Sequence, residues 1–229
     1  MAAKTLPTLE EMLEAGVHFG HQTRKWHPRM REFIFDAREG IHIIDLEKTY
    51  NALETALEVI KKAAKADKNI VFVGTKKQAA PLVRQKADEA NVAYITNRWP
   101  GGLISNYENV KRAIDHYKEL DSQSNDETYL ESLSTKDKYQ VLKQKERLGR
   151  IVAGLQHLDS APDILFIVDP RRESTAVNEA RKSGVVTVGI VDTNTDPTLV
   201  DYPIPANDDA IKSLELIIDS VVKTIQSTK

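Results

Sequence analysis

Short apolar runs that alternate with helical segments constrain the fold of this chain more than any other feature. Each run is rich in valine and isoleucine and lacks the polar–apolar alternation of a strand with one wet face, so it is typical of strands covered on both sides. Strands of this kind, joined by helices, form βαβ units and a mostly parallel sheet. The sequence therefore predicts an α/β fold with helices on both faces of the sheet. The expected strands are 69–75, 92–96, 163–169 and 185–192, with a short proline-containing edge piece at 202–205.

Residues 104–159 interrupt this alternation, because they contain no strand candidate. Helical patterns are expected at 106–120 and 134–158, with the polar residues 121–127 forming a turn between them. Two amphipathic helices joined by a polar link can bury their apolar stripes against each other. We therefore expect an antiparallel helical hairpin of the coiled-coil type that protrudes from the sheet as an inserted arm. The expected domain boundaries are 1–103 and 160–229 for the α/β body and 104–159 for the arm.

Composition limits the class of protein. The chain has 229 residues, of which 41% are hydrophobic, and this is enough for a sizeable core. The absence of cysteine excludes a disulfide framework, a cysteine-based zinc site and thiol catalysis, and it fits a reducing compartment. No apolar run approaches the roughly 20 residues of a membrane helix, and the first residues lack the layout of a secretory signal. We therefore expect a cytoplasmic protein with no membrane contact.

Charge is distributed unevenly along the chain, although the net charge is only −2. Residues 1–112 contain 18 lysines and arginines against 14 aspartates and glutamates, whereas residues 151–229 contain 7 against 12. One end is therefore basic and the other acidic. This asymmetry indicates one surface directed toward a polyanion and another directed elsewhere.

The basic character is concentrated in the segment His18–Thr49, where cations and a tryptophan precede an apolar hairpin pattern. The hairpin is expected at 33–44, with a turn near Glu39 and Gly40. Arginine forks suit phosphate oxygens, and an exposed indole can stack on an unpaired base, although Trp26 could equally cover the hydrophobic core. A proline at position 28 interrupts this run of cations and is expected to hold the chain extended. The candidate RNA-binding residues of this segment are Arg24, Lys25, Trp26, His27, Arg29 and Arg31.

Cations also follow three of the predicted strands, at 76–77, at 98 and at 171–172. Ligands of open α/β sheets gather at the carboxyl ends of strands. Lys76 and Lys77 precede a helix, where positive charge opposes the helix dipole and so favours an anionic partner. Arg98 lies beside Trp99 and repeats the pairing of a cation with an aromatic ring; the alternative is that Trp99 forms a corner at the base of the arm. Lys76, Lys77 and Arg98 are therefore further candidates for RNA binding.

Catalytic and metal sites find less support. The segment VGTKKQA at 73–79 lacks the glycines and the terminal Lys-Ser/Thr of a P-loop, and no serine lies in a GxSxG motif. An enzyme that binds a nucleotide-type ligand at the strand ends remains the alternative function. Two residue sets could also bind a metal ion. The first is His18, His21 and His27, but its basic surroundings would repel a cation. The second is Asp192, Asp196, Asp201, Asp208 and Asp209, and helix capping accounts for these aspartates. We expect no catalytic residue, metal, cofactor or small-molecule substrate.

Six segments of this sequence resemble the bacterial small-subunit ribosomal protein S2 family. They occur in the family order and span nearly the whole chain, at 16–30, 34–49, 71–79, 97–106, 162–170 and 188–197. The resemblance implies a Rossmann-like or flavodoxin-like body with a protruding helical hairpin. It also implies a structural constituent of the 30S subunit, located between head and body, that contacts 16S rRNA and helps to anchor ribosomal protein S1 beside neighbouring 30S proteins. It implies no catalysis, and it assigns the GTKKQ segment and the surroundings of Trp26 to rRNA or its neighbours.

Overall fold

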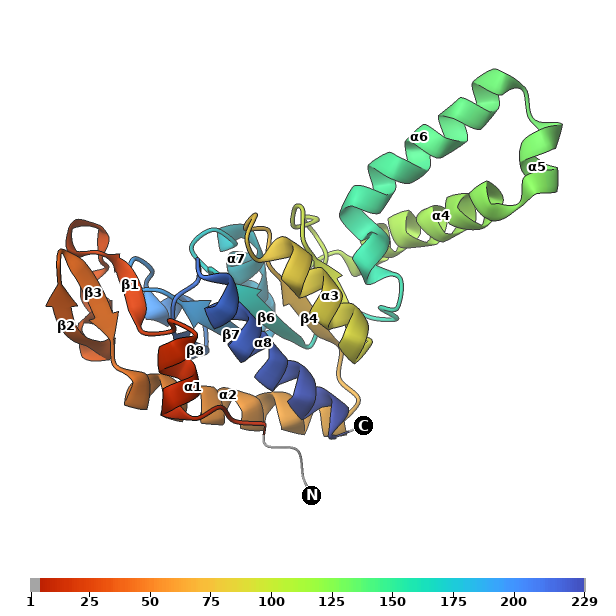
Figure 1. The fold of residues 1–229 in the computed structure, drawn as a ribbon. Coiled ribbons are helices and arrows are strands. Elements are labelled where there is room, and N and C mark those ends of the chain that lie inside the picture. The colour runs from red at the N-terminus through yellow and green to blue at the C-terminus, as the bar shows by residue number, and fades with distance from the viewer. Residues whose placement is uncertain (1–4, 229) are drawn as a thin grey trace.

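The computed structural model describes residues 5–228 and places them in a parallel α/β body, a small antiparallel sheet and a helical segment that extends away from the body (Figure 1). Residues 1–4 and 229, which the sequence analysis assigned to the body, lie outside the described residues.

The body is built on a five-stranded sheet in the order β5-β4-β6-β7-β8. Every neighbouring pair is parallel, so the predicted α/β class with a parallel sheet is confirmed. The three central strands are continuous apolar runs buried on both faces, as the sequence predicted. The strands are β4 (Ile70–Val73), β5 (Ala93–Ile95), β6 (Ile164–Val168), β7 (Val186–Val191) and β8 (Tyr202–Pro205).

Helices cover both faces of this sheet, because alternate strand residues point into two separate cores. Phe72 and Phe166, with ring centroids 5.2 Å apart, enter the core beneath α1, α2, α3 and α8. Val71 and Leu165 point into the opposite core, which α7 shares with the base of α4. The helices of the body are α1 (Leu9–Glu14), α2 (Leu46–Lys65), α3 (Ala80–Ala90), α7 (Ser174–Ser183) and α8 (Ile211–Gln226).

Strand β8 closes one edge of the sheet. Ala206 N–H donates to the carbonyl of Val191, so even-numbered residues of this segment point their N–H groups toward β7 and odd-numbered ones point away. The odd positions are occupied by Pro203 and Pro205, which have no N–H. The carbonyl of Pro205 accepts a hydrogen bond from the Thr49 hydroxyl of α2 at 2.6 Å. At both prolines the outer edge of β8 therefore has no N–H group that could donate a hydrogen bond to another strand.

A second, three-stranded antiparallel sheet has the order β1-β3-β2. The expected hairpin is present, with Glu39 and Gly40 at positive φ in the turn between β2 (Ile34–Arg38) and β3 (Ile41–Ile44). Strand β1 (Phe19–Gln22) was not expected, because the sequence analysis treated these residues as part of a basic loop.

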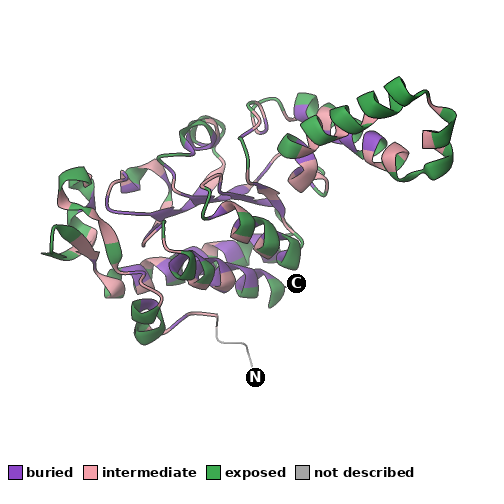
Figure 2. Ribbon diagram, turned by 45° about the horizontal axis from the view of Figure 1, so that its top comes forward, coloured by how far each residue is buried: buried purple, intermediate pink, exposed green. Residues whose placement is uncertain are grey.

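Residues 107–155 form α4 (Tyr107–Asn125), α5 (Glu127–Ser132), α6 (Thr135–Val152) and a 3₁₀ turn, η3 (Ala153–Leu155). Helix α4 leaves the body and α6 returns beside it; both are largely exposed in Figure 2. The predicted turn at 121–127 is wrong for its first five residues, which continue α4. Lys145 of α6 bonds to Asp121 at 2.8 Å and to the Ser124 hydroxyl at 2.6 Å, which ties this last turn of α4 to α6. We call α4–α6 the arm.

Candidate nucleic-acid interface

The basic segment after β1 folds against the carboxyl end of β7. His21 N–H donates to the Thr193 hydroxyl at 2.8 Å, and His27 N–H donates to the Thr193 carbonyl at 2.7 Å. Only glycine fits at position 20, because a Cβ there would lie 2.5 Å from the Thr193 side chain. The segment is extended at Trp26 and His27 but not elsewhere, since it contains two 3₁₀ turns, η1 (Thr23–Lys25) and η2 (Pro28–Phe33). The expectation of an extended chain was therefore correct only next to the proline.

Three cations of this segment point into solvent. Arg24, Lys25 and Arg31 are exposed, and among residues 5–228 none of the three forms an ion pair. Within the described residues, the one hydrogen bond of the Arg24 side chain runs from its Nε to Gln22 Oε1 at 3.0 Å. These three side chains can therefore approach a phosphate without first breaking a salt bridge.

Arg29 and His27 are instead directed toward Asp196. Arg29 donates from Nη1 to Asp196 Oδ2 at 2.7 Å, and His27 Nε2 lies 3.9 Å from the same oxygen. Burial alone would raise the pKa of Asp196, but hydrogen bonds from Thr198 and the charge of Arg29 outweigh it and lower that pKa. Arg29 therefore has an intramolecular partner, although most of its side chain is exposed.

Trp26 is half-buried. Its ring packs against His42 of β3, with centroids 5.3 Å apart and planes tilted by 48°. The indole therefore packs on the small sheet and remains partly exposed.

The two lysines after β4 have different environments. Lys77 is exposed, whereas the side chain of Lys76 is 13% exposed and its ammonium lies 2.7 Å from Asp208 and 2.6 Å from Asp209. Burial alone would lower the pKa of Lys76, but these two carboxylates outweigh it and raise the pKa. The structure therefore gives Lys76 internal anions, and of the two lysines only Lys77 is free to meet a phosphate.

The carboxylates around Lys76 form the one group within residues 5–228 whose geometry could hold a metal ion, together with His21. Ligand atoms of His21, Asp208 and Asp209 lie within 4.8 Å of one another, and Asp208 Oδ2 is buried without a hydrogen-bond partner. Burial, with the charges of Asp192 and Asp169, raises the pKa of Asp208 to about 7. In this arrangement the Lys76 ammonium supplies the positive charge that offsets the repulsion between these carboxylates. The sequence analysis assigned His21 and these aspartates to separate sets.

Arg98 and Trp99, which follow β5, separate into an exposed cation and a buried ring. Trp99 is 6% exposed and packs in the core shared with the base of the arm, which agrees with the corner that the sequence offered as its alternative role. Its Nε1 donates to Glu179 of α7 at 2.7 Å. The same carboxylate accepts bonds from the backbone N–H groups of Gly102, Ile104 and Ser105 and from the Ser105 hydroxyl. The sequence analysis did not identify Glu179, because nothing near it in the chain indicates these partners.

The strand order brings the exposed cations to one edge of the body. Residues that follow β5, β4, β6 and β7 lie in that order along the carboxyl edge of the sheet, with strands about 4.8 Å apart. Arg98 follows β5, Lys77 follows β4, Arg171 and Arg172 follow β6, and the basic segment lies against the end of β7. The sequence analysis quoted both arginines after β6 but did not select them. We call this set of exposed cations the carboxyl-edge surface.

Residues 12–228 match the family model described as Ribosomal protein S2. The "Small ribosomal subunit protein uS2" of Coprothermobacter proteolyticus is 46% identical, over 95% of this chain and 81% of its own length. The protein of the same name from Dictyoglomus thermophilum is 45% identical, over 96% of this chain and 89% of its own length.

The chain belongs to the ribosomal protein S2 family. The resemblance noted in the sequence is thus confirmed. The S2 family consists of structural ribosomal proteins, so the alternative of a nucleotide-binding enzyme is wrong. No helix within residues 5–228 has the length and apolar composition needed to cross a membrane.

Proposed function

We propose that the chain is a structural constituent of the small ribosomal subunit in the cytoplasm, located between head and body, and that its carboxyl-edge surface binds 16S rRNA. The observation that carries the proposal is the exposure of Arg24, Lys25 and Arg31 without internal ion pairs on a segment fixed to the end of β7. Lys77 and Arg98 extend this surface toward β5. Charged side chains that touch phosphates fix the position of a protein on RNA, and selectivity then comes from the shape of the RNA.

Neutralising three of these cations should weaken RNA binding in a salt-dependent way. Each neutralised phosphate contributes roughly 0.7–0.9 to the slope of log affinity against log salt. The triple variant Arg24→Gln, Lys25→Gln and Arg31→Gln is therefore expected to lower the slope by about 2–3. The measurement is filter binding to a 16S rRNA fragment, or to 30S particles that lack this protein, across a salt titration.

A matched control neutralises Lys61, Lys62 and Lys65, which are exposed at the carboxyl end of α2 and thus at the opposite end of the sheet. The control variant has the same net charge as the first triple variant but should keep the slope of the unmodified protein. Equal slopes for the two triple variants would exclude the carboxyl-edge surface as the RNA anchor.

We also propose that the outer face of the small antiparallel sheet binds a neighbouring protein of the subunit, and in particular helps to anchor ribosomal protein S1. Leu13 of α1, Phe19 of β1, and Phe35 and Ile41 are 55%, 48%, 70% and 38% exposed. They line two adjoining shallow cavities, of about 360 and 440 Å³, on this face. Contiguous exposed apolar side chains of this size mark protein-binding surfaces, and aromatic residues dominate the binding energy of such surfaces.

Loss of one exposed ring should reveal this second surface. The variant Phe35→Ser is expected to weaken binding of purified S1 by about tenfold or more, because a central aromatic side chain typically contributes that much. Tyr139→Ser is the control, since Tyr139 is 64% exposed on α6 and lies outside the apolar face. Binding of S1 that is reduced equally by both changes, or by neither, would contradict the assignment; rRNA binding should be unaffected by Phe35→Ser.

A further inference from the structure

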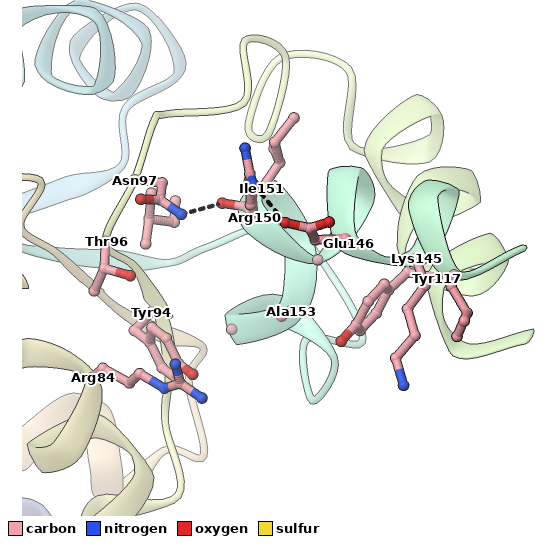
Figure 3. A pocket seen from close by; sticks show the side chains of 14 residues that line it. Arg84, Tyr94, Thr96, Asn97, Tyr117, Lys145, Glu146, Arg150, Ile151 and Ala153 are labelled. Atoms are coloured by element: carbon pink, nitrogen blue, oxygen red, sulfur yellow. Dashed lines mark hydrogen bonds and ion pairs between the residues drawn. The ribbon is translucent and has the colours of Figure 1, made fainter. Parts of the chain in front are cut away.

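A cavity of about 540 Å³ lies where the arm meets the body, and none of the residues of the surfaces assigned above lines it. Its walls come from α3 and the end of β5 on one side and from α4, α6 and η3 on the other. Figure 3 shows Tyr94 of the body and Tyr117 of the arm on opposite sides of it, with Ala153 between them. The volume lies within the range of about 300–1,000 Å³ that is typical of small-ligand sites.

Two glycines bring the chain close enough to shape this cavity. A Cβ on Gly154 would lie 2.3 Å from the Tyr94 carbonyl oxygen, so η3 can reach β5 only without a side chain there. A Cβ on Gly149 would lie 2.9 Å from the Tyr117 ring. The Asn97 side-chain amide donates to the Arg150 carbonyl at 2.8 Å and thereby links the strand end to α6. The close approach of Gly154 to Tyr94 and the Asn97 bond therefore hold the arm wall of the cavity against the body wall.

The cavity is positively charged overall. Three cations line it, Arg84, Lys145 and Arg150, against one carboxylate, Glu146. Lys145 is held in place by Asp121 and Ser124, whereas Arg84 and Arg150 are exposed at the rim. Arg150 contacts Glu146 through Nη2, so its other guanidinium nitrogens can still donate. Guanidinium groups of this kind match the oxygens of a phosphate.

Aromatic and polar groups complete the site. Burial raises the pKa of Tyr94, so the hydroxyl remains neutral and can donate a hydrogen bond near pH 7. Thr96 adds a hydroxyl from the strand end. Tyrosine rings, guanidinium groups and a few polar side chains together are the combination by which proteins take up unpaired bases with their phosphates.

We infer that this junction cavity binds one unpaired RNA nucleotide, with its phosphate on Arg84 and Arg150 and its base between the arm and the body. Charge complementarity selects this occupant over an apolar peptide, since the rim is cationic. A bound nucleotide would contact both walls and so would hold the arm in one orientation relative to the body. The inference does not depend on the carboxyl-edge surface, because the two sets of residues do not overlap.

The test measures binding of short labelled oligonucleotides to the full chain carrying Arg24→Gln, Lys25→Gln and Arg31→Gln, so that the carboxyl-edge surface contributes less to the binding. Adding Arg84→Gln and Arg150→Gln is expected to weaken binding of single-stranded hexauridine about tenfold and to lower its salt slope by about 0.7, the value for one phosphate on a single strand. Adding Lys143→Gln and Arg147→Gln, which are exposed on α6 outside the cavity, should leave both values unchanged. Equal losses in these two variants would overturn the inference.

Photo-crosslinking locates the base. A hexamer that carries 4-thiouridine should crosslink to peptides containing Tyr94 or Tyr117, and Tyr94→Leu should reduce the affinity roughly fivefold or more through lost stacking. If uridine monophosphate binds at the same residues and the strand does not, the site is assigned to a free nucleotide. If the strand binds and uridine monophosphate does not, the site is assigned to RNA. Either result supports nucleotide recognition. Preference for a duplex or for a glutamate-rich peptide over the single strand would refute it.

Discussion

Replacing Lys76 with methionine is expected to lower the free energy of unfolding by about 3–5 kcal/mol at pH 8, as removal of one partner from a buried ion pair generally does. The Lys76 ammonium lies 2.7 Å from a carboxylate oxygen of Asp208, 2.6 Å from one of Asp209 and 3.8 Å from one of Asp169. Methionine has a similar length but leaves these carboxylates to repel one another. Urea unfolding monitored by circular dichroism provides the measurement.

The loss should be smaller at pH 5, and the reason lies in Asp208. Its pKa is raised to about 7 in the folded chain, so the folded state binds this proton more tightly than the unfolded state does. Protonation of Asp208 therefore stabilises the folded state. This contribution to the free energy of unfolding is fully present below the ordinary aspartate pKa of about 3.9, and it is lost as the pH rises through about 7. Without Lys76 the pKa rises further, so acid should partly rescue Lys76→Met.

A second substitution tests this explanation. Adding Asp208→Asn to Lys76→Met should recover part of the stability at pH 8 and flatten the pH dependence, because the neutral amide removes one of the repelling charges. A destabilisation of Lys76→Met that is the same at pH 5 and pH 8 would contradict it. If Lys76 were instead a phosphate ligand, as the sequence suggested, its loss would impair RNA binding and spare the stability of the free protein.

Replacing Glu179 with alanine is expected to cost about 3–4 kcal/mol, because five hydrogen bonds from the loop that leads into α4 end on this carboxylate. Burial alone would raise the pKa of Glu179, but the bonds from Ser105, Trp99 and Ile104 outweigh it and lower that pKa. The carboxylate is therefore charged when it holds the start of the arm. Thermal and urea unfolding, with tryptophan fluorescence reporting on Trp99, would measure the loss.

Glu179→Gln keeps the size of the side chain but replaces one acceptor oxygen with an amide. It therefore shows how much of the loss comes from the hydrogen bonds and how much from the missing side chain. The amide would place a donor against some of the same N–H groups, so an intermediate loss is expected. Glu58→Ala, an exposed glutamate on α2, should change stability by less than about 0.5 kcal/mol. A glutamine variant as stable as the unmodified protein would show that the five bonds are not what secures this loop.

The parts of the fold that could be predicted from sequence are those whose pattern is local. Continuous apolar runs identified β4, β6 and β7. Strand β1 was missed because the four residues FGHQ show no apolar alternation, and their pairing is set by β3. The turn between the arm helices was misplaced for a similar reason, since Lys145 stabilises the end of α4 from another helix.

Prediction of the candidate site was limited by contacts distant in sequence. Lys76 and Lys77 are adjacent residues of one type, yet only Lys76 turns toward Asp208, which lies 132 residues further along the chain. Glu179 accepts from Trp99 across 80 residues in the same way. Residue types could therefore indicate that cations gather near the strand ends, but only the fold determines which of them remain available to a partner.

The two prolines at the β8 edge of the sheet affect how the chain behaves before it joins the ribosomal subunit. A newly synthesised copy has none of its partners, and an open strand edge would allow another copy to extend the sheet and begin a fibre. Pro203 and Pro205 withhold the outward donors, and Thr49 occupies the carbonyl of Pro205. Another copy therefore meets no outward donor at either proline, which makes β8 a poor template for extending the sheet before the chain joins the subunit.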